Sequence, residues 1–184
     1  MRHTKLLPGG CAALAAVCLG LFLLPRFAAP AEGGEELLYV SRCYAKSYDT
    51  VEDFAADSDF IGLVEITGAA GTERDADTDL CYTTFTAAVT DRLLGTSASI
   101  ELVVETAPEA VRSSPEEPLP EVGETWFLFA RSTGDGAYIT LNGPEGRFAY
   151  DTADGTLSQL SQTDGGLSGL TLDEMEAQVS AALA

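Results

Sequence analysis

The chain has 184 residues, and its 10 lysines and arginines against 29 aspartates and glutamates give a formal net charge of −19. This charge excludes a nucleic-acid-binding protein that neutralises phosphates, and it disfavours a domain that lies on anionic lipid. The only histidine is His3, so the rest of the chain has no Ser-His or Cys-His nucleophile pair and no His-ligated zinc.

The first 31 residues have the pattern of a secretory signal peptide. A basic start is followed by an apolar run from Leu6 to Leu24, and Ala29-Pro30-Ala31 supplies the small residues that precede a cleavage site at Glu32. The alternative is an uncleaved membrane anchor, because the apolar run approaches the ~20 residues that span a bilayer. In both cases the basic start predicts that the rest of the chain lies outside the membrane, as a secreted protein or on the extracytoplasmic face.

Residues 32–184 carry seven bases and 29 acids, a formal charge of −22, and their length suits one domain. Residues 32–150 are expected to form a β-barrel. Residues 151–184 are expected to hold a flexible Gly/Ser/Thr/Gln-rich segment and then an amphipathic helix. In this helix Thr171 and Glu174 form a capping box, and an apolar stripe predicts docking on the chain's own core.

The elements predicted for the barrel begin with a short helix at Thr50–Ala56, capped by Asp49 or Thr50. Apolar runs and period-2 alternation then predict strands at Phe60–Thr67, Tyr82–Leu94, Ser99–Glu105, Thr125–Arg131, Ala137–Leu141 and Phe148–Tyr150. Five or six such strands with one helix before and one after predict a mainly β fold. The expected architecture is a small closed antiparallel barrel with a short N-terminal helix and a C-terminal helix.

Two of these strands are expected to be buried on both faces. In the first, Phe60, Val64 and Ile66 share one face and Ile61 and Leu63 the other. In the fourth strand apolar residues flank Trp126, which predicts core packing for this side chain rather than a ligand platform.

Cys43 and Cys81 are the two cysteines beyond the predicted signal peptide. An even pair in an exported domain predicts a disulfide, which would close a loop of roughly 38 residues and contribute about 4 kcal/mol in the chain-entropy model. The alternative is two free thiols, one of them reactive. Since no histidine flanks either cysteine and only Lys46 lies near enough to lower a thiol pKa, the bridge is the better prediction.

Two long connections interrupt the strand pattern. Gly68–Asp79 is expected to be an acidic hairpin loop, and Ala107–Gly123 a long loop with four prolines, a length often connected with function. Asp75, Asp77 and Asp79 have the spacing that begins a calcium loop. However, Leu80 occupies the position that needs glycine, and Thr86 the position of the bidentate glutamate, so we expect a solvated loop tip without a metal.

Several segments occur in a characteristic order: Asp59–Val64, Leu93-Leu94-Gly95, Val104–Pro108, Val122–Phe129, Gly134-Asp135-Gly136 and Ile139-Thr140-Leu141. In this order the chain, from Cys43 to about Gly146, resembles the netrin/tissue-inhibitor-of-metalloproteinases type of OB-fold, and also exported bacterial proteins of unassigned function. Inhibitors of that family chelate the protease zinc through the α-amino group of an N-terminal cysteine. Here Cys43 would lie 11 residues inside the mature start, and the family's dense cysteine framework is missing. The resemblance therefore implies the fold and not the inhibitory mechanism.

No catalytic, cofactor or nucleotide motif is evident. With 29 acids, any pair of carboxylates suited to glycosidase chemistry is uninformative. A dyad of Lys46 with Ser41 or Ser47 lacks a known catalytic spacing, and an exposed lysine is the expectation.

The sequence therefore predicts an exported, non-catalytic binding module with a protein partner, favoured to be basic because the chain is acidic. Its expected contact surface is the barrel rim, with Asp75, Asp77, Asp79, Pro108, Glu109, Glu116 and Glu117. The alternatives are a protease inhibitor that acts through an exposed loop and, less favoured, a carboxylate-based hydrolase.

Overall fold

The computed structural model describes residues 46, 48–76, 80–106, 119–160 and 167–184. All of them belong to one compact unit, Leu37–Ala184. The predicted signal peptide or anchor lies outside the described residues, as does Cys43. Among the described residues, none of the helices has the length and apolar character needed to cross a membrane.

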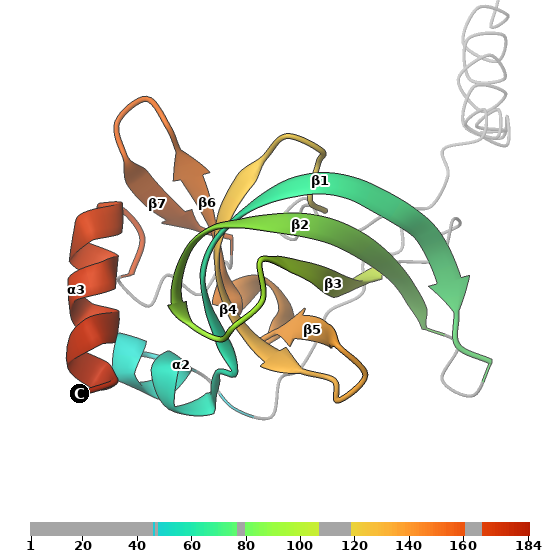
Figure 1. The fold of residues 1–184 in the computed structure, drawn as a ribbon, viewed down its shortest axis with the longest axis horizontal. Coiled ribbons are helices and arrows are strands. Elements are labelled where there is room, and N and C mark those ends of the chain that lie inside the picture. Colours follow the sequence, from blue (N-terminus) through green and yellow to red (C-terminus); the bar gives the residue numbers. More distant parts are fainter. Residues whose placement is uncertain (1–45, 47, 77–79, 107–118, 161–166) are drawn as a thin grey trace, which may run out of the picture. The chain divides into compact units, whose positions relative to one another are not determined.

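The chain alternates a few helical turns with seven strands (Figure 1). In order, the elements are α2 (Val51–Asp57), β1 (Phe60–Arg74), β2 (Cys81–Leu94), β3 (Ser99–Thr106), β4 (Thr125–Ser132), β5 (Ala137–Thr140), the 3₁₀ helix η1 (Gly143–Gly146), β6 (Arg147–Asp151), β7 (Thr156–Gln159) and α3 (Leu172–Ala182). The six predicted strands and both predicted helices are present.

Five of the strands close into a barrel in the order β1-β2-β3-β5-β4, and β4 returns to pair with β1. This confirms the predicted closed barrel. Four of the five pairings are antiparallel, whereas β3 and β5 run parallel. The parallel pair follows from parity, because a closed ring with an odd number of strands cannot alternate direction throughout.

β6 and β7 extend this sheet beyond the ring. β4 pairs with β5 through Ala130–Ser132 and with β6 through Trp126–Leu128, so β5 and β6 follow one another along the same edge of β4. β7 is a strand that the sequence pattern did not predict, since Leu157 is the only apolar residue among its four. Leu157 is nevertheless fully buried, which gives the segment its place in the core.

The two faces of the sheet form two separate cores, as the alternation in β1 predicts. Phe60, Val64 and Ile66 lie inside the barrel, in the same cluster as Trp126, which is 2% exposed. Ile61 and Leu63 face the other way, toward the helices. The predicted role of Trp126 in core packing is confirmed.

Aromatic stacking and a buried stripe hold the two helices against the outer face of the barrel. Phe54 of α2 stacks on Phe129 of β4, with ring centroids 4.8 Å apart. In α3, Met175 and Val179 are fully buried in the same outer core. Thr171 and Glu174 form the predicted capping box. The docking of α3 on the chain's own core is therefore confirmed.

The Gly68–Asp79 connection differs from the prediction, because β1 continues to Arg74 and β2 begins at Cys81. Glycine and alanine have low strand propensity, which led the sequence pattern to predict a loop from Gly68 onward. Pairing with the β-rich start of β2 overrides this preference, up to the Arg74–Cys81 pair. The two strands therefore form a long ribbon that includes Gly68–Arg74, where the sequence pattern predicted a loop.

Candidate ligand-binding site

Most of the residues predicted for the contact surface lie outside the described part of the chain. Asp75 is described and half-buried, whereas Asp77, Asp79, Pro108, Glu109, Glu116 and Glu117 fall in the ranges that are not. Within the described ranges, no group of three or more His, Cys, Asp or Glu side chains could hold a metal ion. Cys81 is a buried free cysteine, no disulfide is seen among the described residues, and the bridge to Cys43 stays a prediction.

The strand ends that lead into the two predicted loops are neighbours. Cys81, at the start of β2, pairs with Thr106, at the end of β3, in the last position of the β2–β3 ladder. The Gly68–Asp79 connection therefore ends beside the point where the Ala107–Gly123 connection begins. The pocket of the structure lies at this end of the barrel, since Tyr82 and Glu105, next to the Cys81–Thr106 pair, line it.

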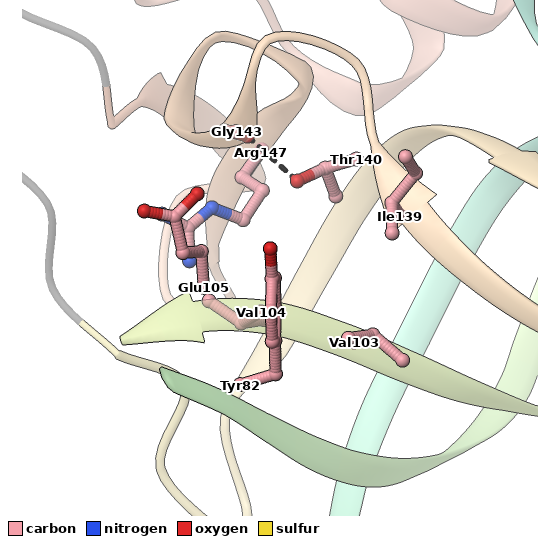
Figure 2. A pocket seen from close by; sticks show the side chains of 8 residues that line it. All are labelled: Tyr82, Val103, Val104, Glu105, Ile139, Thr140, Gly143 and Arg147. Atoms are coloured by element: carbon pink, nitrogen blue, oxygen red, sulfur yellow. Dashed lines mark hydrogen bonds between the residues drawn. The ribbon is translucent and has the colours of Figure 1, made fainter. Parts of the chain in front are cut away.

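This pocket lies where β3 and β5 separate. The two strands pair only from Glu101–Ala137 to Val103–Ile139, and beyond this point β5 turns away toward η1. The space has a volume of about 240 Å³ and is lined by Tyr82, Val103, Val104, Glu105, Ile139, Thr140, Gly143 and Arg147 (Figure 2).

One side of the pocket is apolar and aromatic. Val103 and Ile139 lie opposite each other in the parallel β3–β5 pair, and Ile139 is 43% exposed although it is a large hydrophobic residue. Tyr82 lies opposite Glu105 in the β2–β3 ladder, on the same outer face. Figure 2 shows the tyrosine hydroxyl pointing to the side of the pocket where Thr140 and Arg147 lie.

The other side contains a buried cation. Arg147 begins β6 and is only 2% exposed, and its guanidinium carbon lies 5.2 Å from the centre of the Trp126 ring. The cation–π contact offsets part of the cost of burying the charge. Next to it the Thr140 hydroxyl donates a hydrogen bond of 2.7 Å to the carbonyl of Gly143. Arg147 also has an interaction partner within the chain, so it is part of the pocket wall.

Lys46, the candidate base of a serine–lysine dyad, belongs to a separate ionic cluster. Its ammonium lies 2.6 Å from Asp57 Oδ2, and the Tyr48 hydroxyl donates to the same oxygen at 2.9 Å. The hydrogen bond from Lys46 lowers the pKa of Asp57, and the same bond raises the pKa of Lys46. Lys46 is 48% exposed and stays protonated near neutral pH, so it is poorly suited to take a proton from a serine. Ser41 and Ser47 lie outside the described residues.

A carboxylate pair joins α3 to β2. Burial raises the pKa of Glu176, and the charges of Asp91 and Asp173 and a hydrogen bond to Asp91 raise it further. Glycosidase carboxyl groups lie about 5–9 Å apart, whereas Asp91 and Glu176 are close enough to share a hydrogen bond. We interpret the pair as a packing contact of α3.

No protein-family model, curated protein sequence or solved structure matches this chain. The resemblance to the netrin/tissue-inhibitor type of OB-fold therefore stays a prediction.

Proposed function

We propose that this chain is an exported, non-catalytic binding module that holds a group of its partner in the pocket between β3, β5 and η1. The observation that carries the proposal is the composition of this pocket. An apolar wall that includes the exposed side chain of Ile139 is combined with the hydroxyl groups of Tyr82 and Thr140. Ligand sites in proteins combine such apolar walls with a few fixed polar groups.

The chemistry of the walls indicates what the pocket can hold. The Tyr82 hydroxyl can donate or accept a hydrogen bond, and Val103 with Ile139 suits an apolar body. Arg147 and Glu105 already have interaction partners within the chain, so they form part of the wall. A volume of about 240 Å³ corresponds to roughly eight waters at ~30 Å³ each. This is room for one compact amphipathic group, such as a single residue of a partner protein.

The partner class follows from the charge of the chain. Residues 32–184 carry a formal charge of −22, which favours a basic protein and accelerates its approach. Export is inferred from the leader, and the absence of catalysis from the missing catalytic motifs. The two rival functions, a loop-based protease inhibitor and a carboxylate-based hydrolase, have no specific contact among the described residues in their favour.

A fragment screen by NMR tests the pocket. The ¹⁵N-labelled chain from Glu32, which contains the whole compact unit, is titrated with amphipathic fragments that carry a carboxylate, an amine or both. We expect shifts to gather at Tyr82, Val103 and Ile139. Binding that maps elsewhere, or no binding at millimolar fragment, would remove the pocket as the site.

A substitution of the exposed wall separates binding from folding. Ile139→Ser should weaken fragment binding at least tenfold and leave the fold intact, since the side chain is 43% exposed. Thr84→Ala is the matched control, because Thr84 lies on the same outer face of β2 but does not line the pocket. Equal binding by the Ile139→Ser variant and its control would contradict the proposal.

A further inference from the structure

β1 is paired on both edges over only part of its length. One edge pairs with β2 through the whole strand, whereas the other pairs with β4 only from Phe60 to Glu65. The last contacts on this second edge are hydrogen bonds of Ile66, whose N–H donates to the Glu124 carbonyl at 2.9 Å and whose carbonyl accepts from Gly123 at 2.8 Å. From Thr67 to Glu73, no described strand lies along this edge. We call this stretch the β1 edge.

The β1 edge has few of the features that protect exposed strands from pairing. Proteins protect such edges with charged side chains, prolines, bulges or short strands. From Thr67 to Thr72 the sequence is Thr-Gly-Ala-Ala-Gly-Thr, without charge or proline, and these residues are exposed except for the half-buried Gly68. Register shifts between Ile66 and Gly68 and between Ala69 and Thr72 bend the ribbon, as its curve in Figure 1 shows. The bends limit an added strand to about five residues, the usual strand length.

The surroundings of the β1 edge indicate the charge and character of an added strand. Glu73 is exposed at one end of it, Glu65 and Glu121 are exposed near its other end, and Arg74 adds one positive charge. At its base Val122 is 65% exposed, more than any other large hydrophobic side chain among the described residues. A second copy of the chain would bring another −22 charges, so like-charge repulsion disfavours it. An extended basic segment with apolar residues complements both the carboxylates and Val122.

We infer that the β1 edge is a strand-addition site, where an extended basic segment of a partner protein pairs with about five residues within Thr67–Glu73 and places an apolar side chain against Val122. The main-chain hydrogen bonds supply affinity, and the carboxylates with Val122 supply selectivity. The inference rests on the proposed function, a module for a basic protein partner, and adds a contact surface outside the pocket.

The probe is a capped eight-residue peptide of alternating lysine and valine, titrated into the ¹⁵N-labelled chain from Glu32. Strand addition slows hydrogen exchange at alternate amides of the β1 edge. Replacement of every lysine by glutamate should weaken binding at least tenfold at low salt, and the difference should shrink as salt is added. Equal affinity of the lysine and glutamate peptides would refute the inference that the added segment is basic.

Two N-methylated peptides test the pairing itself. Each carries N-methyl groups on every second residue, in opposite phase, so only one of them loses the donors that face β1. Strand addition requires one phase to abolish binding and the other to retain it. Equal effects of the two phases would refute pairing at the β1 edge.

A side-chain variant tests the role of Val122. Val122→Ser should weaken the lysine peptide about fivefold, the scale of partly burying one valine side chain. Leu183→Ser, at the end of α3, is the control, since this leucine is also exposed, at 42%. Equal affinity of the two variants would exclude a contact with Val122.

The peptide experiment tests the β1 edge and the fragment experiment tests the pocket, so one proposal can be refuted while the other stands. Peptide shifts at Tyr82 and Ile139 alone would refute strand addition and support the pocket. No peptide binding at millimolar concentration would refute the β1 edge, while the fragment screen still decides the proposed function.

Discussion

The closure of the barrel depends on a glycine where two strands approach closely. Gly62 in β1 is paired on both sides, opposite Arg92 of β2 and Leu128 of β4. A Cβ added at this position would lie 2.4 Å from the backbone oxygen of Asp91 and 3.1 Å from the Cα of Arg92. Both are backbone atoms of a paired strand, so β1 and β2 would have to separate to accommodate an alanine.

Gly62→Ala should therefore be strongly destabilising. Overpacking typically costs about 1–3 kcal/mol, and each ladder hydrogen bond lost beside it adds about 1 kcal/mol. We expect a loss of about 3 kcal/mol in the free energy of unfolding, or a fall in Tm of about 6–12 °C for a domain of this size.

Gly68→Ala is the matched control within the same strand. Its added Cβ would meet only the hydroxyl oxygen of Thr86, at 2.9 Å, which is the end of a side chain that can rotate. Alanine also recovers some of the conformational entropy that glycine loses in a strand. The change in stability should stay within about 0.5 kcal/mol.

Urea unfolding measures both variants through the fluorescence of Trp126, the single tryptophan, which is buried inside the barrel. The reasoning predicts a large difference between the two glycines. Equal costs, or a cost below about 1 kcal/mol for Gly62→Ala, would show that the β1–β2 approach is not as close as described.

Three further predictions concern α3. Met175→Ala should cost about 2–5 kcal/mol in urea unfolding, because the side chain is fully buried between helix and barrel; a smaller loss would mean that α3 docks loosely. Thr171→Ala should cost about 1 kcal/mol at pH 7. Hydrogen bonds from Thr171 lower the pKa of Glu174, so the part of this cost that depends on the Glu174 carboxylate should be complete above pH 4.5 and be lost as the pH falls through the lowered pKa. The hydrogen bond from the Glu174 N–H to the Thr171 hydroxyl does not titrate, so a smaller cost remains at pH 3; a loss at pH 3 equal to that at pH 7 would contradict the prediction. The pKa of Glu176 is raised, so its ionisation destabilises the fold as the pH rises above 4.5, and Glu176→Gln should stabilise the chain by about 0.2–0.5 kcal/mol at pH 7 but not at pH 4, as judged from Tm.

The sequence was informative wherever a local pattern determines the structure. The alternation of Phe60 to Ile66 reports which face each side chain occupies, and the Thr171–Glu174 pair marks a helix start, because both depend on neighbours in the chain. The ribbon beyond Gly68 was not predictable from its own residues, since glycine and alanine form a strand there only by pairing with β2. β7 was also unpredictable from its own residues, because its single apolar residue, Leu157, is buried only through packing against the rest of the fold.

The pocket was less predictable than the fold, because its walls come from elements far apart in the sequence. Tyr82, Glu105 and Ile139 meet only through the β2–β3 and β3–β5 pairings. Arg147 precedes Phe148 in an alternating strand, a pattern that predicts a solvent-facing arginine. Its burial follows from its position opposite Leu128, on the face of β4 that lines the barrel. No local signal in the sequence would have identified it.

The positions of the cations bear on the proposed preference for a basic partner. Lys46 and Arg131 both ion-pair with Asp57, and Arg147 is buried against Trp126. These three positive charges therefore contribute little to the field that an approaching molecule meets, which is dominated by carboxylates. At ionic strengths near 0.01 M this field extends about 30 Å, and at 0.15 M about 8 Å. Association with the proposed basic partner should then slow as salt is added. Dissociation, which the proposals assign to contacts in the pocket and at the β1 edge, should change much less.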